Sequence, residues 1–303
     1  MLHLNHSCIM TMLDRHPWSR KFKDWISTND LRHKTIQWQR AGGVCQLLVL
    51  GRPSDASRPT VIFLHGLGND ALFPNIELFR HLLSTGFNIV TCDIDGHGQS
   101  STTVLGTNTI CSFVSDVIAQ CDEFLIGRPR LHLCGFSFGA ALLLHYAVHH
   151  PERVLSLSLI GMPLHLATPL LFLGEILTPF MKSYIHAMKD YGLMGIQPAF
   201  GPFLRHRYPM RLEPGETANY IAVAATIIDK IKPAELLRLV TFPTLYMAGS
   251  LDLIANFSAT IEFIKGLKGS GIQTCELRGE THFTSMLSLN GARTIEVLLR
   301  TSL

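Results

Sequence analysis

The feature that most limits the possible folds of this chain is the alternation of apolar, strand-like runs with amphipathic helical patterns. The strand-like runs, in chain order, are VIFLHG, NIVTCDID, RLHLCGFS, VLSLSLIG, TLYMAGS and IQTCELRG. Runs that stay apolar throughout are typical of strands buried on both faces. Their alternation with helical segments predicts βαβ units and therefore an α/β fold with a mostly parallel, doubly wound sheet.

Two β-rich runs precede this pattern, TIQWQ and VCQLLVL, and they flank Ala41-Gly42-Gly43. Glycines between two such runs are typical of a hairpin turn. We therefore expect the sheet to begin with an antiparallel pair and to contain eight strands in all.

Residues 162–235 interrupt the alternation. Proline, methionine and aromatic residues are frequent there, and residues 168–192 and 215–231 have helical patterns. Because an unstructured loop of this length would be unusual, we interpret the segment as a helical cap over the carboxyl ends of the strands. The predicted organisation is a core of residues 1–161 and 236–303 with a cap or lid at 162–235.

The composition suits a single globular enzyme and argues against polyanionic partners. The 303 residues are 47% hydrophobic, which is enough for one large core carrying an insertion. The net charge is +3 without a Lys/Arg block, so we expect no nucleic-acid binding. Seven scattered cysteines without a CxxC pair favour buried, reduced thiols over disulfides or a zinc site.

Neither the N-terminal segment nor the longest apolar stretch predicts targeting to a membrane. Histidines and an early acid interrupt the N-terminal segment where a signal peptide needs a continuous apolar stretch, so we expect a cytoplasmic protein. Residues Leu164 to Met181 form the longest apolar stretch, but Pro169, Glu175 and Pro179 interrupt it. This stretch is marginal for a membrane span and is better interpreted as a lid.

The sequence GFSFG, residues 135–139, lies between a strand-like run and a helical pattern. A strand followed at once by a helix requires a sharp turn at Ser137, and glycines two positions away on either side remove the side chains that would collide. The turn exposes the Ser137 hydroxyl and leaves the Phe138 amide at a helix N-terminus, where developing negative charge is stabilised.

With this turn and five further motifs, the chain resembles the α/β-hydrolase superfamily from about Thr60 to His282. The other motifs, in order, are HGLG at 65–68, DIDGHGQS at 93–100, HPERV at 150–154, GSLD at 249–252 and GETHF at 279–283. The resemblance implies the α/β-hydrolase fold and a second oxyanion-hole amide at Leu67. The order of serine, aspartate and histidine is also that of the family.

The resemblance implies Ser137 as the nucleophile, His282 as the general base and Asp252 as the acid that orients it. Imidazole, with its near-neutral pKa, suits the activation of a serine hydroxyl, and a carboxylate fixes its tautomer. His65 and His97 are less favoured candidates for the base, and Asp93 and Asp95 are less favoured for the acid. The adjacent His149 and His150 point in different directions on a helix and favour a helix end over a metal-ligand pair.

The residues around the serine predict an apolar substrate. Phe136 and Phe138 flank Ser137, and Phe172 lies in the lid segment, so we expect Phe136 and Phe172 to contact a hydrophobic acyl group. The GHGQS loop looks like that of monoacylglycerol-lipase-like and lysophospholipase-like members. Serine in place of aspartate argues against dehalogenase and epoxide hydrolase chemistry. Arg205 and Arg207 could bind an anionic substrate group, although a solvated surface is the more common role.

We therefore predict a serine esterase that acts through an acyl-enzyme, without a metal or organic cofactor. Its partners would be an apolar ester and, through the cap, a transiently contacted lipid interface. The same residues would also suit an acyltransferase or a thioesterase, and the fold could serve as a receptor for a small ligand.

Overall fold

We analysed the chain in a computed structural model. The residues that the structure describes are 12–14, 17–40, 43–55, 57–67, 69–98, 100, 107–121, 130–165, 224–267, 269, 271–282 and 284–303. The predicted lid residues 166–181, with Phe172, lie outside the described residues, as do Arg205 and Arg207.

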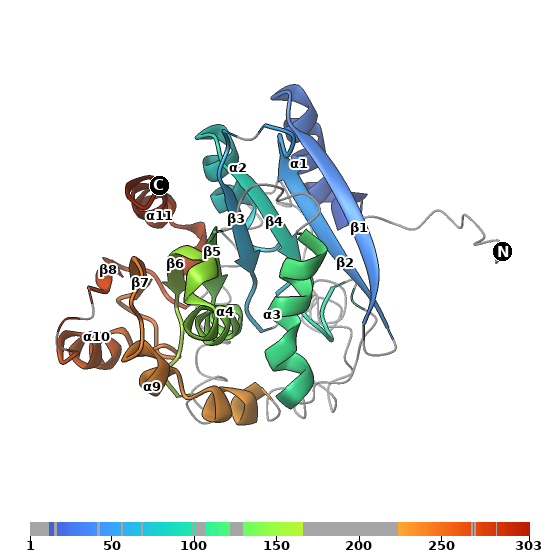
Figure 1. The fold of residues 1–303 in the computed structure, drawn as a ribbon. Coiled ribbons are helices and arrows are strands. Elements are labelled where there is room, and N and C mark those ends of the chain that lie inside the picture. Colours follow the sequence, from blue (N-terminus) through green and yellow to red (C-terminus); the bar gives the residue numbers. More distant parts are fainter. Residues whose placement is uncertain are drawn as a thin grey trace, which may run out of the picture.

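An eight-stranded sheet forms the centre of the molecule, with the strand order β1-β2-β4-β3-β5-β6-β7-β8 (Figure 1). The strands are β1 (Arg32–Arg40), β2 (Gly43–Gly51), β3 (Thr60–Leu64), β4 (Asn88–Cys92), β5 (Leu131–Phe136), β6 (Val154–Ile160), β7 (Thr244–Gly249) and β8 (Gln273–Leu277). The first two pairings, β1 with β2 and β2 with β4, are antiparallel, and all later pairings are parallel. This confirms the predicted α/β-hydrolase fold with its antiparallel start and mostly parallel sheet.

Helices cover both faces of the sheet and bury two separate apolar cores (Figure 1). These helices include α1 (Pro17–Thr28), α2 (Ile76–Ser84), α3 (Thr107–Cys121), α4 (Phe138–His149), α9 (Pro233–Leu237), α10 (Phe257–Lys265) and α11 (Leu289–Thr301). The first core includes residues of α3, α4, α9 and α10, and the second includes residues of α1, α2 and α11. Every residue of β3, β4, β5 and β7 is buried, which explains why these strands are predominantly apolar.

Helix α1 was not anticipated from the sequence. Its residues Phe22 and Ile26, four positions apart, are fully buried in the second core. Spacing of this kind places both side chains on one face of a helix. A proline at the first helical position, Pro17, is a further signal that could have identified the helix.

Most of the predicted cap, 162–235, lies outside the described residues, so the division into core and cap stays a prediction. Of its described part, residues 224–231 are helical, and Ala224, Ile227 and Ile228 are buried in the first core. Within the described ranges, no helix combines the length and the apolar character needed to cross a membrane.

A buried ion pair ties the first hairpin to the loop after β4. The Arg40 side chain, 5% exposed at the end of β1, donates through Nη1 to Asp95, whose side chain is fully buried. Arg40 Nε also donates to Asp116 Oδ2 of α3 at 2.8 Å, and the guanidinium lies 5.1 Å from the centroid of the Phe113 ring. Removal of a charge from water is costly, so each partner of such a pair depends on the other.

We expect Arg40→Met to lower the free energy of unfolding by about 3–5 kcal/mol, because Asp95 would keep a buried charge without its cation. Chemical denaturation would measure this change. The double variant Arg40→Met with Asp95→Leu should recover much of the loss, because no buried charge remains. Equal stability of Arg40→Met and the wild type would contradict this account of the pair.

Candidate active site

The turn between β5 and α4 places Ser137 at the carboxyl edge of the sheet. Its backbone has φ 50° and ψ −114°, in a region that residues other than glycine rarely adopt. The Ser137 amide donates to the Ile160 carbonyl of β6 at 2.8 Å, which fixes the strained residue against the neighbouring strand. The residue is 7% exposed, so its hydroxyl lies in a nearly enclosed position.

The two glycines of the GFSFG run are required by close backbone approaches. A Cβ atom at Gly135 would lie 2.7 Å from the Cα of Ala140 in α4. A Cβ atom at Gly139 would lie 2.4 Å from the carbonyl oxygen of His65. A side chain at either position would therefore collide with its neighbours, as expected from the sequence. Only glycine permits the turn to pack against both α4 and the loop after β3.

Three side chains from distant parts of the sequence form a continuous hydrogen-bonded row. His282 Nε2 lies 3.0 Å from Ser137 Oγ, and His282 Nδ1 lies 2.9 Å from Asp252 Oδ2 and 3.1 Å from Asp252 Oδ1. The His282 side chain is 3% exposed and that of Asp252 is fully buried. With Nδ1–H donating to the carboxylate, Nε2 is left with a lone pair that faces the serine hydroxyl.

The loops that carry Asp252 and His282 are held against each other at the ends of β7 and β8. The Leu251 amide donates to the Glu280 carbonyl at 2.9 Å, and a Cβ atom at Gly249 would lie only 2.0 Å from that same oxygen. The Asp252 carboxylate also accepts the amide of Ala255 at 2.7 Å through Oδ1. These contacts orient the carboxylate independently of the histidine.

The two residues whose amides are predicted to bind an oxyanion lie close to the serine, Phe138 directly after it in the sequence and Leu67 directly after Gly66. Phe138 is the first residue of α4, so its amide belongs to the first helical turn, where the amides have no partner within the helix. The loop of Leu67 follows Gly66, at which a Cβ atom would lie 3.1 Å from Ser137 Cβ. The backbone before Leu67 therefore passes directly beside the serine. Phe138 itself is fully buried in the first core.

The alternative histidines have structural partners close to this loop. His65 Nδ1 lies 2.8 Å from the Gly66 carbonyl, and His65 Nε2 accepts the Ile94 amide at 2.9 Å. The His97 ring packs edge-on against His65 with 5.0 Å between the ring centroids. Burial lowers the pKa of His65 to about 4 and that of His97 to about 3, so both imidazoles are neutral near pH 7.

The alternative acids are also engaged elsewhere. Asp93 Oδ1 accepts the Ala71 amide at 2.8 Å, and Asp95 pairs with Arg40. Asp252 contacts the His282 imidazole through both of its oxygens. The structure thus brings Asp252, the favoured acid, to hydrogen-bond distance of His282.

Phe136 lies beneath the site, in the second core. Its side chain is 1% exposed, and its ring centroid is 4.9 Å from that of His282 at a 39° tilt. This contact supports the imidazole from below and was not anticipated from the sequence. Contact between Phe136 and a substrate stays a prediction.

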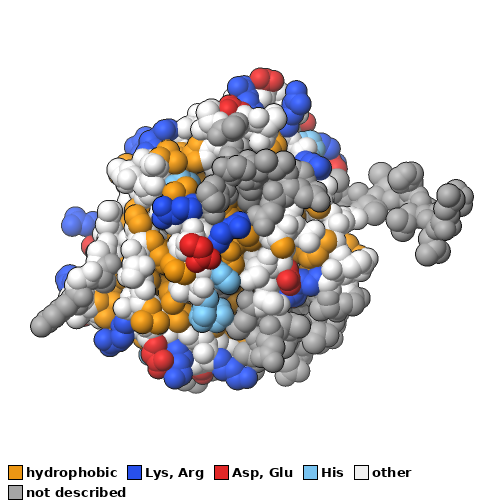
Figure 2. Space-filling view, in the orientation of Figure 1, with side chains coloured by type: hydrophobic (Ala, Val, Ile, Leu, Met, Phe, Trp, Pro, Cys, Tyr) orange, Lys and Arg blue, Asp and Glu red, His pale blue; other side chains and the backbone are white. Residues whose placement is uncertain are grey.

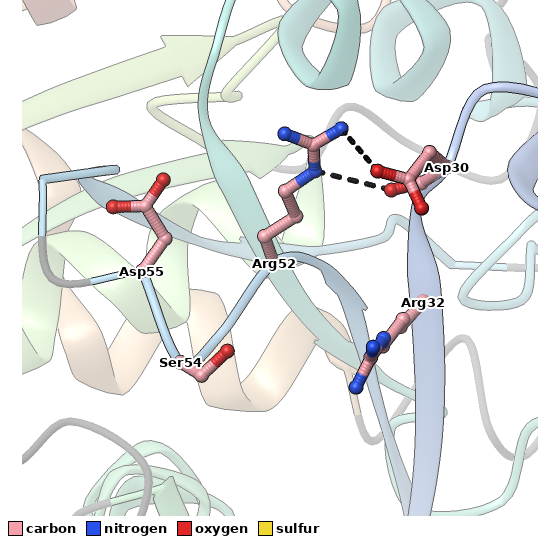
Figure 3. A pocket seen from close by; sticks show the side chains of 5 residues that line it. All are labelled: Asp30, Arg32, Arg52, Ser54 and Asp55. Atoms are coloured by element: carbon pink, nitrogen blue, oxygen red, sulfur yellow. Dashed lines mark hydrogen bonds and ion pairs between the residues drawn. The ribbon is translucent and has the colours of Figure 1, made fainter.

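A polar hollow lies at the opposite edge of the sheet (Figure 3). It is lined by Asp30, Arg32, Arg52, Ser54 and Asp55. Arg52 is turned toward Asp30 and donates to its Oδ2 at 2.8 Å, whereas Arg32 is turned away from both. Because the Arg52 amide donates to the side chain of Asn88, the first residue of β4, the hollow borders the amino ends of the parallel strands. It is therefore remote from Ser137.

Across the described ranges of the chain, no group of three or more His, Cys, Asp or Glu side chains is arranged to hold a metal ion. Cys45, Cys92, Cys121 and Cys134 are buried, reduced thiols. Burial raises the pKa of Cys134 well above its ordinary value, which keeps this thiol protonated and unreactive.

Residues 59–185 match the family model described as alpha/beta hydrolase fold. The sequence is also 36% identical over 102 residues to the dihydrolipoyllysine-residue acetyltransferase component of the acetoin cleaving system from Cupriavidus necator, covering 34% of this chain and 26% of that protein. It is 28% identical over 111 residues to monoacylglycerol lipase abhd6-B from Xenopus laevis, covering 36% of this chain and 32% of that protein. The matched segments thus span only about a quarter to a third of these relatives.

A solved structure extends the likeness over nearly the whole chain. The 2-hydroxy-6-oxo-6-phenylhexa-2,4-dienoate hydrolase from Rhodococcus sp. strain RHA1 superposes with a TM-score of 0.61 at 18% sequence identity, covering 89% of this chain and 99% of that one. Together with the strand order and the family match, this makes the chain an α/β-hydrolase-fold protein. Its sequence relatives include hydrolases, among them the monoacylglycerol lipase.

The buried neutral histidines predict a loss of stability in acid. Burial also lowers the pKa of His132, in β5, to about 4, whereas an unfolded histidine titrates near pH 6.5. Between these values the unfolded chain binds more protons than the folded one. The stabilisation is therefore complete above about pH 6.5 and is lost as the pH falls toward 4, by about 1.4 kcal/mol per pH unit for each histidine.

Urea denaturation between about pH 7 and pH 5 would measure the slope of the unfolding free energy against pH. His132→Leu should reduce this slope by the contribution of about one bound proton. Leu133→Ala on the same strand is the matched control, because it leaves a cavity without removing a titrating group. It should lower stability at every pH and keep the slope. An unchanged slope in His132→Leu would contradict the lowered pKa of His132.

Proposed function

We propose that this protein is a serine hydrolase that cleaves carboxylic esters of hydrophobic acyl groups through an acyl-enzyme on Ser137. The observation that carries the proposal is the row from Ser137 through His282 to Asp252, with both hydrogen-bond steps between 2.9 and 3.1 Å. A serine hydroxyl becomes a useful nucleophile only beside a base that is itself oriented by a third group.

In the proposed acylation step, His282 Nε2 takes the proton of the Ser137 hydroxyl as Oγ attacks the ester carbonyl carbon. The carbonyl π bond opens to an oxyanion, and Asp252 stabilises the imidazolium that forms. The imidazolium then returns its proton to the leaving alcohol as the ester C–O bond breaks. A water molecule repeats the sequence on the acyl-enzyme, which releases the carboxylic acid and restores the serine.

The amides of Leu67 and Phe138 are proposed to donate to the oxyanion. An amide at the first turn of α4 is favourably placed, because the partial positive charge of a helix N-terminus stabilises negative charge. Donors fixed by the backbone need no rearrangement as the charge develops, and one such donor contributes about 3–4 kcal/mol in other acyl-transfer enzymes.

Hydrophobic acyl groups are proposed because apolar residues adjoin those of the row in the sequence. Phe136 and Phe138 are the neighbours of Ser137, and Leu251 and Leu253, with 53% and 58% of their surfaces accessible, are the neighbours of Asp252. The name of the Xenopus laevis relative, a monoacylglycerol lipase, is in keeping with such a substrate. Contact of Phe172 with the acyl chain, and of the cap with a lipid interface, remain part of this proposal.

Transfer of the acyl group to an acceptor other than water is the second candidate. The observation that favours it is the similarity to the Cupriavidus necator protein, whose name is that of an acetyltransferase component. Both reactions share the acyl-enzyme, so they differ only in the nucleophile that removes the acyl group. Partition of product between the free acid and a thioester, measured with a small thiol present, distinguishes the two.

We expect Ser137→Ala and His282→Ala each to lower kcat for a p-nitrophenyl ester by about four to six orders of magnitude. The double variant should lose little more, because the two residues act as one unit. Asp252→Asn should lose about ten-thousandfold, because the wrong histidine tautomer would be favoured. Steady-state kinetics on folded variants would measure these changes.

Ser158→Ala is the matched control, since Ser158 is a buried serine of the adjacent strand β6 and should leave kcat unchanged. Multiplicative losses in the double variant would contradict a shared mechanism. Near-normal activity of Asp252→Asn would move the orienting role to another acid. No turnover by the wild type across a series of acyl lengths would favour the receptor alternative.

A further inference from the structure

Histidine side chains gather on the face of the molecule over α4 (Figure 2). His145 and His149 lie in the last two turns of α4, and His150 follows the helix. This end of the helix is remote from the candidate active site. His145 and His149 follow Ser137 by eight and twelve residues, which corresponds to about 12 and 18 Å of helix.

His145 and His149 are four positions apart and therefore lie on the same face of the helix. Their ring centroids are 4.4 Å apart, and the ring planes are tilted by 34°. Metal–imidazole bonds are about 2.0–2.1 Å long, so a ring separation of this size is compatible with one ion bound to a nitrogen of each ring. Paired histidines four residues apart on a helix bind zinc in other proteins.

The hydrogen bonding of His149 presents one nitrogen to an ion. His149 Nδ1 lies 2.7 Å from the carbonyl oxygen of His145, so Nδ1 carries the proton and donates it. This fixes the tautomer in which Nε2 carries the lone pair. Metal-binding histidines commonly donate their other ring N–H to a carbonyl in this way, which orients the ring.

The electrostatic surroundings also favour a cation at this place. The helix ends at His149, and the carbonyls of a last turn carry a partial negative charge. Glu152 adds an acidic side chain nearby, 3.7 Å from His150 Nδ1.

We propose that His145 and His149 form a binding site for a divalent transition-metal cation of the Zn²⁺, Ni²⁺ or Cu²⁺ class. Imidazole suits these ions, whereas Mg²⁺ and Ca²⁺ prefer oxygen ligands. Two protein ligands leave coordination positions for water or for the same pair on a second copy of the chain. His150 is not a ligand, because its ring packs on Tyr146, with 4.6 Å between centroids.

Isothermal titration of the full chain with Ni²⁺ tests the proposal. Ni²⁺ is the probe because thiolates select Zn²⁺ and Cu(I), and the chain has seven cysteines. We expect His145→Gln and His149→Gln each to weaken the binding at least about tenfold. Glutamine has the higher helix propensity, so α4 should persist, and circular dichroism would verify this.

His150→Gln is the matched control and should change the affinity by less than about twofold, as expected of a surface substitution. Ester hydrolysis by all three variants should equal that of the wild type, so failure of this proposal is distinct from failure of the proposed function. Unchanged Ni²⁺ affinity in His145→Gln or His149→Gln would overturn the site. A loss in His150→Gln equal to that in His149→Gln would overturn the ligand assignment.

Discussion

The arrangement of the candidate active site depends on one sharp reversal of the chain, at Ser137. A strand that turns into a helix within a single residue forces that residue to φ 50°, where a side chain is strained. The strain persists because surrounding contacts determine the backbone: the Ser137 amide bonds to β6, and Gly135 and Gly139 permit close approach to α4 and the loop after β3. The same turn places the hydroxyl, the Phe138 amide and the start of α4 within one small region.

Parallel strands provide the second constraint, because their carboxyl ends meet at one edge of the sheet. Ser137 follows β5, Asp252 follows β7 and His282 follows β8, so three residues spread over 145 positions of sequence reach hydrogen-bond distance. Burial of an imidazole and a carboxylate would be unfavourable if either lacked a partner. The contacts of Asp252 with His282 and with the Ala255 amide supply those partners.

Local patterns in the sequence predicted the sheet, because buried parallel strands are predominantly apolar. The resemblance to the α/β-hydrolase superfamily predicted the three residues of the row, which lie in motifs at strand ends. Interactions that depend on distant packing were not predicted. The Arg40–Asp95 pair joins residues 55 positions apart, and it requires the register of the first hairpin. The support of His282 by the Phe136 ring depends on which face of β5 that ring occupies.

The histidine pair on α4 was also not predicted, because the ring partner of His149 is His145, four residues away, and not the adjacent His150. Helix α1 was missed although its buried residues have helical spacing, because a short isolated helix gives little sequence signal before its packing surface is known. Strand burial and turn sterics depend on residues close in the sequence, whereas ion pairs and ring contacts depend on how distant segments pack.

The central claim is that Ser137 is an activated nucleophile. Labelling of the full chain with a fluorophosphonate reagent, followed by mass spectrometry of its peptides, tests this most directly. The account predicts a single covalent adduct on Ser137, abolished in Ser137→Ala and strongly slowed in His282→Ala. A folded wild-type chain that takes up no label, or an adduct that persists on another residue in Ser137→Ala, would contradict it.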